Sequence, residues 1–457
     1  MTSTYPFDTF SAGELAPPDL PSRRRGLARG AAAVMFLGAT APITAALSSL
    51  ASALGSSPPV SSTDPCTVLI NTTRMTKGLV LARAFHAAGH RVVLADTARH
   101  RLGAGRFSRA VSASFVVPDP QVDFEGYASA MARIVERERV DLFVPVNSPA
   151  GAQLDARLKP RLPCRVLHLG PADNAAVDDK FAFARIARRA GLTVPRTLLV
   201  DHPRVLADFR DDTGGQWVLK PAVYDPIGRQ DKVRLPFGDP ARQRRWASTL
   251  SIDPQHPWVL QQFVEGTEFC AHATVVNGEI WVYACARSSP YQLNYASVDP
   301  PRVRAWVESF VEALGATDAQ LCFDFIVDAE GTPWALECNP RLHSAITLFQ
   351  DQPARLADAY LGRSSACLTP TPSTAPTYWL AMELERLARV REPRQIARWA
   401  RHLWTGRDAV FQRGDPWPFF ALHHLQIPSL LLRNARRGGR WTHVDWCIGK
   451  VVEPQGD

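Results

Sequence analysis

The most constraining feature of this sequence is a pair of apolar, strand-like runs at residues 321–327 and 332–341. They flank a short turn in which an Asp and a Gly suit the special backbone angles of a hairpin. Side chains two positions apart in a strand share a face, so Glu337 and Asn339 point the same way. A hairpin with a turn of about six residues then sets Asp324 opposite Glu337. The pattern predicts two carboxylates and an amide on one face, followed by a cation at Arg341.

This cluster has two interpretations. Magnesium prefers hard oxygen ligands and keeps room for water and substrate phosphates, which fits Asp324, Glu337 and Asn339 as metal ligands. The alternative is a surface hairpin whose polar residues simply face water. Charged residues alternate here with Phe, Trp and Leu, which implies one packed face and one chemically selected face. We therefore favour the metal site.

The composition limits the other classes of function. The chain has 457 residues, enough for two to three domains, and its formal charge of +8 is spread rather than gathered in long basic blocks. The balance does not require nucleic acid; a polyanionic small ligand or an anionic membrane explains it equally well. Eight cysteines without a Cys-x-x-Cys pair predict a reducing compartment, with neither disulfides nor a zinc site.

Residues 66–175 have the pattern of a Rossmann-like lobe. A buried strand at 67–70, a turn at 71–78, a helix at 79–88 and a strand at 91–95 make a β-α-β unit, and a helix at 127–139 and strands at 140–146 and 165–169 follow. The turn lacks the G-x-G-x-x-G that admits a pyrophosphate, so we predict a substrate-contacting lobe rather than an NAD site. Asn147, at the carboxyl end of a strand, either contacts ligand or belongs to a capping turn.

Two lysines and a polar turn lie between this lobe and the hairpin. Lys180 opens a helix that stops at Gly191, and Lys220 ends the apolar strand 216–220. A second apolar strand runs into a polar turn that contains Gln261, Gln262, Phe263, Val264 and Glu268. Each feature alone is commonplace: a lysine is most often solvated surface, and an apolar strand most often ends in a polar turn.

Together with the hairpin, these residues resemble the ATP-grasp superfamily. The resemblance implies that Lys180 and Lys220 contact the phosphates of ATP, and that the backbone of the hinge Gln261 to Val264 bonds adenine while Glu268 accepts from the ribose. It also implies that Asp324, Glu337 and Asn339 bind Mg²⁺, as two ions, with Mn²⁺ as an alternative metal. The loop 222–234 departs from the usual Gly-rich lid, so Arg229, Lys232 and Arg234 are expected to hold phosphates by charge.

The resemblance extends to one branch of the superfamily, the ligases of mycosporine biosynthesis. It is carried by Met75-Thr-Lys77 and by residues 81–92, 178–183, 337–347 and 422–428. It implies joining of glycine to the enol carbon of 4-deoxygadusol, with Lys220 and Arg341 balancing phosphate charge. His343 is either the general base or a structural hydrogen-bonder, and Arg287, Asn294 and Ser344 are further candidates for substrate contact.

Two other hypotheses for the function remain open. A carboxylate–amine ligase that forms an acyl phosphate would use the same ATP site. A non-catalytic, membrane-tethered nucleotide-binding protein would not need every metal ligand and both lysines. The predicted architecture is α/β: an apolar anchor at 23–55, a linker at 56–65, the Rossmann-like lobe, a two-subdomain ATP-grasp fold at 176–365 and a helical C-terminal extension at 366–457. Nothing in the sequence indicates an oligomeric state.

The N-terminal region predicts a membrane association. Residues 1–22 have the composition of a disordered segment, and four arginines from Arg23 to Arg29 then precede an uncharged stretch from Gly30 to Thr63. A signal peptide ending near Ala53, a single span, or an uncleaved anchor bent near Pro42 all fit. The first two would separate an ATP-dependent enzyme from cytoplasmic ATP, so we favour the anchor and a cytoplasmic, membrane-associated enzyme.

The C-terminal extension contains a second apolar stretch. Helices are expected at 382–390 and 396–404, and the apolar run 417–432 is followed by Arg433, Arg436, Arg437 and Arg440. Core packing is the default interpretation of such a run, and a second membrane-facing surface is the alternative.

Overall fold

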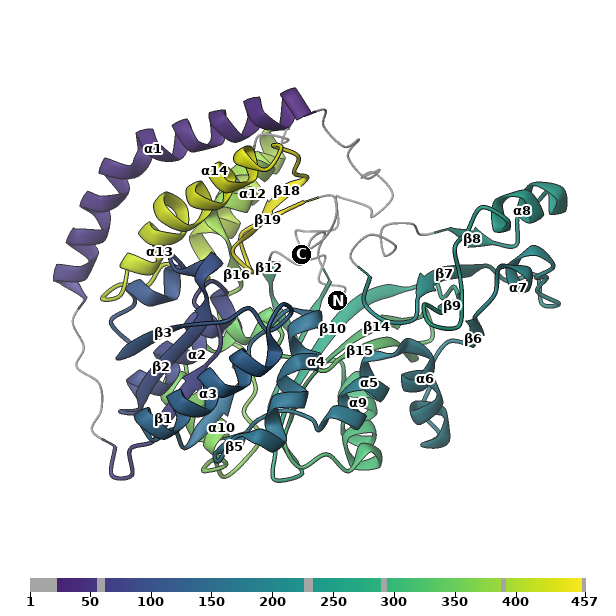
Figure 1. The fold of residues 1–457 in the computed structure, drawn as a ribbon, viewed down its shortest axis with the longest axis horizontal. Coiled ribbons are helices and arrows are strands. Elements are labelled where there is room, and N and C mark those ends of the chain that lie inside the picture. The colour runs from purple at the N-terminus through teal and green to yellow at the C-terminus, as the bar shows by residue number, and fades with distance from the viewer. Residues whose placement is uncertain (1–22, 56–61, 226–232, 289–293, 388–391, 454–457) are drawn as a thin grey trace.

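A computed structural model gives the fold over residues 23–55, 62–225, 233–288, 294–387 and 392–453. The predicted disordered segment 1–22, most of the linker 56–65, and Arg229 and Lys232 of the predicted lid lie outside the described residues. Within them, a parallel-sheet lobe, a central antiparallel sheet and a small subdomain follow one another from one side of the molecule to the other (Figure 1).

The first lobe is a five-stranded parallel sheet in the order β3-β2-β1-β4-β5. Its strands are β1 (Thr67–Ile70), β2 (Arg91–Thr97), β3 (Ala113–Val117), β4 (Leu142–Val144) and β5 (Arg165–Val166). Its helices are α2 (Thr76–Ala87), α3 (Phe124–Glu138) and α4 (Pro149–Leu158), with 3-10 turns η1 (Ala98–His100), η2 (Ala104–Phe107) and η3 (Lys159–Arg161). The predicted β-α-β unit and its parallel sheet are confirmed.

Three local predictions in this lobe were wrong, one of them the strand expected at 165–169, since β5 covers only Arg165–Val166. Helix α2 begins at Thr76 rather than at residue 79. Gly78 lies inside the helix instead of ending a turn. The backbone of Gly78 packs closely against Thr72, because a Cβ on this glycine would lie 2.3 Å from Cγ2 of Thr72. Strand β4 covers Leu142–Val144 rather than 140–146. Pro145 follows it directly and has no N–H to donate to a neighbouring strand.

The small subdomain carries a four-stranded antiparallel sheet in the order β6-β9-β7-β8. It comprises β6 (Thr197–Val200), α7 (Pro203–Ala207), β7 (Trp217–Pro221), β8 (Arg234–Leu235), α8 (Pro240–Ala247) and β9 (Trp258–Gln262). The helices α5 (Pro171–Asp178) and α6 (Lys180–Arg189) connect it to the first lobe. Trp217 and Leu260 lie in the hydrophobic core of this subdomain.

The central sheet is antiparallel, in the order β13-β11-β10-β14-β15. Its elements are β10 (Thr267–Val276), β11 (Glu279–Arg287), β13 (Ser297–Val298), α9 (Pro301–Leu314), β14 (Ala319–Val327) and β15 (Pro333–Asn339). Asn277 and Gly278 form the tight turn between β10 and β11, and both have positive φ, at 55° and 87°. Phe183 of α6 and Phe310 of α9 pack with Phe323 of the sheet in one core.

The C-terminal region does not build a core of its own. Its helices are α10 (Pro353–Leu361), α11 (Leu380–Leu387), α12 (Pro393–Thr405), α13 (Trp417–Ala421) and α14 (Ile427–Arg436), with a 3-10 turn η6 (Ser344–Phe349) and a π-helical turn η7 (Leu422–Gln426). Its strands are β16 (Thr377–Tyr378), β17 (Arg407–Asp408), β18 (His443–Asp445) and β19 (Lys450–Val452). Strand β16 pairs with β12 (Asn294–Tyr295), which lies earlier in the chain. Trp379, Leu422 and Ile427 pack in the same core as Phe85 of α2. Most of the apolar run 417–432 is therefore core, as the default interpretation has it.

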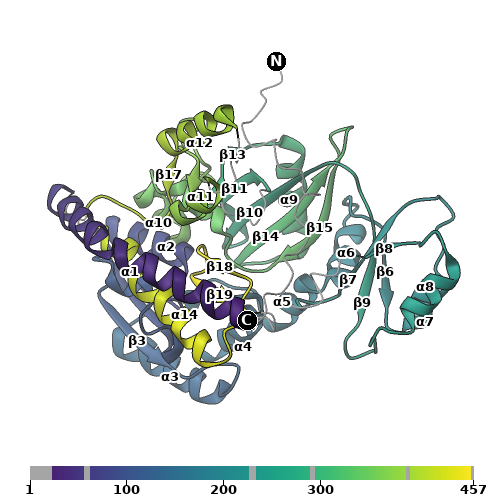
Figure 2. The ribbon, with the colours of Figure 1, turned by 90° about the horizontal axis from the view of Figure 1, so that it is seen from above.

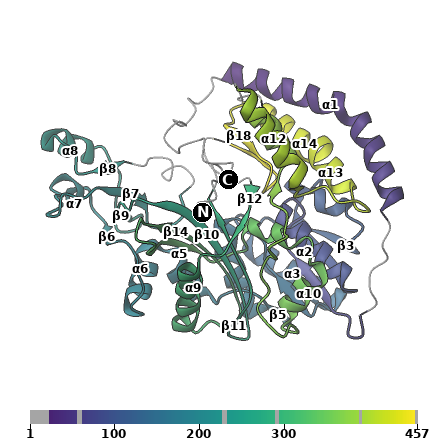
Figure 3. The ribbon, with the colours of Figure 1, turned by 180° about the vertical axis from the view of Figure 1, so that it is seen from behind.

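The N-terminal segment forms one helix, α1 (Arg23–Leu54), which continues through Pro42. It lies along α13, η7 and α14 and curves over them with its convex side outward (Figures 1 and 2). Seen from behind, α1 and the yellow C-terminal elements stay side by side at one end, while α9 and the small subdomain occupy the other (Figure 3).

Candidate active site

The β14–β15 hairpin brings the predicted carboxylates together. Asp324 pairs with Glu337 across the two strands, and a register shift follows directly after Asp324. The Nδ2 group of Asn339 donates toward Asp324 Oδ2 at 3.3 Å and toward Glu337 Oε1 at 3.5 Å. The strand periodicity therefore gave the correct partner for each side chain, and all three residues are only half-buried, so a ligand can reach them.

The charges around the two carboxylates are unequal. Burial, together with the facing charge of Glu337, raises the pKa of Asp324 to about 8. Burial also opposes ionisation of Glu337, but Lys180 and Lys220 outweigh it and hold the pKa of Glu337 at about 2. Lys180 Nζ lies 3.2 Å from Glu337 Oε2. The structure thus brings both predicted lysines to the predicted metal ligands.

Gln261 connects the two subdomains at this site. Its Oε1 accepts a hydrogen bond of 2.8 Å from Lys220 Nζ, and its Nε2 donates at 3.0 Å to the carbonyl of Leu336, next to Glu337. The side chain is only 2% exposed. Since both ends of its amide are bound within the protein, Gln261 positions Lys220 rather than offering its side chain to a nucleotide.

The rest of the predicted hinge leaves one donor open. The N–H of Gln262 donates to Arg196 O and that of Phe263 to Gln216 O, each at 2.8 Å. The N–H of Val264 has no partner among the residues that the structure describes. Glu268, at the start of β10, is exposed and close enough to contribute to the raised pKa of Asp324. The open donor and the exposed carboxylate fit the predicted contacts with adenine and ribose.

Arg341 and His343 follow the hairpin directly. Arg341 is half-buried, and its charge counteracts the rise in the pKa of Asp324. His343 is 8% exposed, and its Nδ1 accepts from the N–H of Ala345 at 3.2 Å. Burial lowers the pKa of His343 well below its ordinary value, so the ring is neutral and Nε2 carries its proton. Nε2 has no partner among the described residues. This geometry favours His343 as a hydrogen-bond donor over a general base.

The remaining candidates separate into two groups. Arg234 of the predicted lid stacks 4.0 Å from the ring of Phe263, and Arg287 lies 5.9 Å from the ring of Phe269. Buried Asn294 hydrogen-bonds Glu383, and the hydroxyl of Ser344 meets Cys447 Sγ at 2.7 Å. Asn294 and Ser344 thus have partners inside the protein, and their role as substrate contacts stays a prediction.

Asn147 also faces inward. Its Nδ2 donates to Asp155 at 3.0 Å, and the neighbouring Ser148 caps α4. Of the two interpretations of this turn, the structure supports the capping one.

Two charged residues near the site were not singled out by their sequence pattern. Lys77, in the first turn of α2, is buried and donates at 2.7 Å to the carbonyl of Leu342; burial and then Arg341 lower its pKa to about 7. Burial raises the pKa of Asp178, which accepts from Gln153 at 3.1 Å and lies near Arg341 and Lys180. A lysine at a helix N-terminus, where the dipole disfavours cations, is a signal that could have marked Lys77.

The donor set fits Mg²⁺ in part. The described residues contain no group of three or more His, Cys, Asp and Glu side chains arranged to hold a metal, so the site rests on two carboxylates and an amide. A cation between Asp324 and Glu337 would relieve the repulsion that raises the pKa of Asp324. Asn339 would present oxygen to it after a half-turn of its amide. Such a set leaves coordination positions for phosphate oxygens and water.

The chain resembles several solved structures that are distant from it in sequence. N5-carboxyaminoimidazole ribonucleotide synthetase in complex with ADP aligns with 70% of this chain and 82% of its own, at 15% identity and a TM-score of 0.53. N5-carboxyaminoimidazole synthetase from Staphylococcus aureus covers 67% and 79%, at 14% identity and 0.51. The biotin carboxylase domain of Hydrogenobacter thermophilus 2-oxoglutarate carboxylase, with MgADP, covers 66% and 70%, at 14% and 0.50.

No protein-family model and no curated sequence matched the chain. The structural likeness, together with the two antiparallel sheets that face each other across Gln261, establishes the fold: this is a chain of the ATP-grasp fold, with a Rossmann-like lobe before it.

Proposed function

We propose that the protein is an ATP-dependent ligase that joins an amine to an activated oxygen substrate and releases ADP and phosphate. The observation that supports this most directly is the meeting of Lys180 and Lys220 with the carboxylate pair Asp324 and Glu337 across the two subdomains. Cations and acidic metal ligands gathered at one point are what the terminal phosphates of ATP require. A surface hairpin would not set two facing, half-buried carboxylates beside two lysines.

The particular reaction we propose is synthesis of mycosporine-glycine from 4-deoxygadusol and glycine. Its support is the sequence resemblance at residues 75–77, 178–183, 337–347 and 422–428. The enol gives up its proton to water, its oxygen attacks the γ-phosphorus of ATP, and ADP leaves. The neutral amine of glycine then adds to the ring carbon that bears the phosphorylated oxygen. The C–O bond breaks, phosphate departs with that oxygen, and the nitrogen gives up a proton to phosphate or water as the enaminone forms.

The chain's own residues position and neutralise the reacting groups. Lys220, held by Gln261, faces the phosphate end, and Lys180 balances Glu337. Asp324, Glu337 and Asn339 would hold bound Mg²⁺, or Mn²⁺ in its place, and we propose two such ions. The metal would neutralise negative charge on the phosphates. Arg341 supplies positive charge toward the acceptor, and His343 offers its Nε2 proton to a ring oxygen of the acceptor.

Isotope transfer tests the proposed reaction. Purified full-length protein is incubated with ATP, Mg²⁺, glycine and 4-deoxygadusol labelled with ¹⁸O at the ring oxygens, and the released phosphate is analysed by mass spectrometry. We expect ADP rather than AMP, with one label in phosphate, because the oxygen that leaves comes from the ring.

Other outcomes assign other functions. Label that enters phosphate only from the carboxylate of the amino acid would identify an acyl-phosphate ligase, with the ATP site unchanged. Nucleotide binding without turnover for any acceptor pair would identify a non-catalytic protein.

We also propose that the enzyme is cytoplasmic and associates with a membrane through residues 23–55.

A further inference from the structure

Helix α1 has two faces that differ in side-chain size. The face toward α13 and α14 carries small residues: Gly26, Gly30 and Ser48 are buried, and Leu37 is the one large apolar side chain buried there. The opposite face carries large apolar side chains with 56% to 77% of their surface exposed: Met35, Phe36, Ile43, Leu47, Leu50 and Leu54. A helix that serves only the core of a soluble protein has the reverse arrangement.

The small-residue face is fastened to the C-terminal region along its whole length. Near the start of the helix, Trp441 Nε1 donates to Gly26 O at 3.0 Å, and a Cβ on Gly26 would lie 2.0 Å from Gly439 O. In the middle, His424 Nδ1 meets Leu37 O at 2.8 Å. At the end, Gly414 N donates to Ala51 O at 3.3 Å. The helix therefore lies flat on the protein, which a helix crossing a bilayer at a steep angle could not do.

Positive charge gathers at one end of this helix. Arg24, Arg25 and Arg29 lie in its first two turns, and Arg436, Arg437 and Arg440 are exposed at the end of α14, next to Gly26. None of these six arginines takes part in an ion pair among the described residues. Arg29 lies 4.6 Å from the centre of the Trp441 ring, and none of the six has a carboxylate partner among the described residues. Arginines without a carboxylate partner beside an apolar face are complementary to anionic lipid headgroups.

A second helix on the same side of the molecule adds an aromatic anchor. Figure 2 looks down on α1, α14 and α12 together on the near face. On α12, Trp404 is 89% exposed and Ile396 is 48% exposed, two turns apart on one side of the helix. Exposed Arg398 and Arg401 flank them. Tryptophan with arginine neighbours is typical of the level of lipid headgroups.

We propose that the outer face of α1, with Trp404, is a monotopic membrane-binding surface for a bilayer that contains anionic lipid. Residues 24–54 are long and apolar enough to cross a membrane, and the proposal is that they do not cross it: α1 stays docked on α13 and α14 and lies in the plane of one leaflet. Its length of about 48 Å is then spread along the surface. Lipid binding by this surface does not depend on which reaction the active site performs.

Vesicle flotation tests the surface. The full-length protein is mixed with preformed vesicles of phosphatidylcholine alone or with about one-third phosphatidylglycerol, and the floating fraction is measured. We expect most of the protein to float with anionic vesicles. Phe36→Ser, Leu47→Ser and Leu50→Ser combined should reduce that fraction at least tenfold, and Trp404→Ala should reduce it several-fold. Replacing Arg24, Arg25 and Arg29 with Gln should weaken the preference for anionic lipid several-fold, since Arg436, Arg437 and Arg440 remain.

A matched control carries the same kind of change elsewhere. Val122→Ser with Val205→Ser removes two exposed apolar side chains away from this face and should float like the unaltered protein. ADP release by the triple variant should match that of the unaltered protein, which separates loss of lipid binding from loss of folding. Flotation of the triple variant at the unaltered level, or no flotation of the intact protein with any vesicle, overturns the proposal.

Protease access distinguishes the flat orientation from a span. An epitope placed before residue 1 should be fully cleaved by trypsin added outside sealed vesicles, since both ends of α1 stay on that side. A protected N-terminal fragment would show that the helix crosses the bilayer. Sedimentation without vesicles covers one more occupant: a dimer that the triple variant dissociates would assign the face to a second copy of this chain and overturn the lipid proposal.

Discussion

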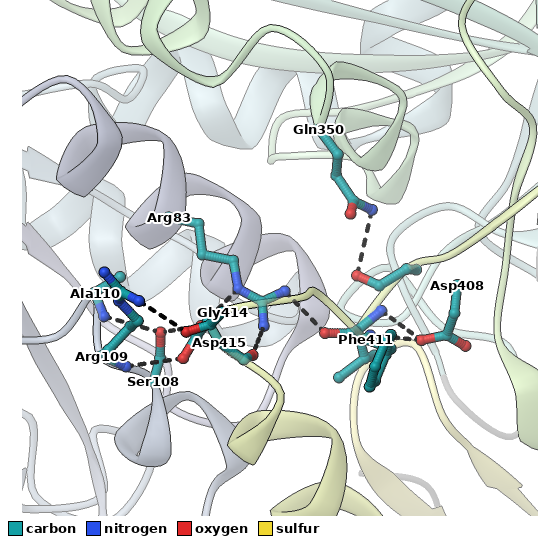
Figure 4. A network of polar contacts seen from close by, with 11 residues as sticks. Arg83, Ser108, Arg109, Ala110, Gln350, Asp408, Phe411, Gly414 and Asp415 are labelled. Carbon is teal, nitrogen blue, oxygen red and sulfur yellow. Dashed lines mark hydrogen bonds and ion pairs between the residues drawn. The ribbon is translucent and has the colours of Figure 1, made fainter. Parts of the chain in front are cut away.

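The structure contains two carboxylate clusters at lobe boundaries with opposite electrostatics. In the first, Asp415 of the C-terminal region faces Arg83 of α2 at 2.8 Å, and its oxygens also accept from Ser108 Oγ and Arg109 N at 2.6 and 2.9 Å (Figure 4). Arg83 donates further to the carbonyls of Val410 and Asp415. This cluster is complete without a ligand.

In the second cluster two carboxylates face each other. Asp324 and Glu337 share one amide donor, the side chain of Asn339, at the long distances of 3.3 and 3.5 Å. The pKa of Asp324 rises to about 8. The difference separates the roles of buried charge. A satisfied pair fixes the relative position of two segments, whereas two facing carboxylates resist being ionised together until a further cation lies between them. Variants that remove one charge from each cluster should therefore have opposite effects on stability and activity.

The largest expected effect is on turnover at the second cluster. Glu337→Gln and Asp324→Asn should each lower ADP release by about three orders of magnitude or more, because phosphate charge is no longer neutralised in the transition state. Without metal, Asp324→Asn should unfold at the unaltered temperature or higher, since a repulsion is removed, whereas Glu337→Gln should unfold at a lower temperature, since Lys180 and Lys220 lose their partner. Near-normal turnover in either variant would reject the site, and a large loss of thermal stability in Asp324→Asn would mean that this carboxylate has a structural role.

The complementary change breaks the first cluster. Arg83→Met should lower the free energy of unfolding by roughly 3–5 kcal/mol, because Asp415 is left buried without its cation. Denaturant unfolding measures this, and turnover per folded molecule should stay unchanged. Arg83→Met combined with Asp415→Asn should recover part of the loss. A single variant as stable as the unaltered protein would show that the pair does not hold the lobes.

A further carboxylate, the fully buried Asp155, has no cation partner and allows the comparison to be tested through the pH dependence of stability. Asp155 accepts only from neutral groups, Asn71, Asn147 and Tyr127, and burial raises its pKa to about 6. The folded protein therefore keeps a proton that the unfolded chain loses near its ordinary pKa of 3.8. Stability from this group is complete below about pH 4 and falls by roughly 3 kcal/mol as pH rises through 6. Chemical denaturation across this range should show a decline that Asp155→Asn flattens; the same decline in the variant would contradict the assignment.

The smallest expected effect concerns the residue that joins the sheets. Gln261→Ala frees Lys220 from its acceptor and should lower turnover by about 10- to 100-fold through misplacement of that cation. Gln261→Glu keeps an oxygen for Lys220 and should retain more activity than Gln261→Ala. Steady-state rates at saturating ATP separate the two variants, and equal rates would mean that Lys220 needs no positioning.

The sequence predicted what depends on neighbouring residues. The pairing of Asp324 with Glu337 follows from strand periodicity and a short turn, and the β-α-β unit follows from alternating runs. The contacts of Gln261 could not be predicted this way, because Lys220 and Leu336 lie 41 and 75 residues away. Nor could the Asp155 network, whose donor Asn71 is 84 residues distant.

The orientation of α1 escaped prediction for a different reason. Its faces differ in size rather than polarity, since Gly, Ala and Ser alternate with Phe, Leu and Ile, so hydrophobic periodicity cannot distinguish them. Only the surface that α1 covers, supplied by the last fifth of the chain, tells which face is inside. The three interpretations of the segment could not be separated without it.

The contacts of α1 also set an order of events during synthesis. Gly26 meets Trp441 across 415 residues, and Leu37 meets His424 across 387. At about 5–20 residues per second, the ribosome completes the docking surface roughly 20 to 80 s after α1 has left it. Throughout that interval, α1 exposes its large apolar side chains as well as the carbonyl groups of Gly26 and Leu37, which later contact Trp441 and His424. Helix α1 therefore stays without its partners in the protein until the C-terminal docking surface has been made.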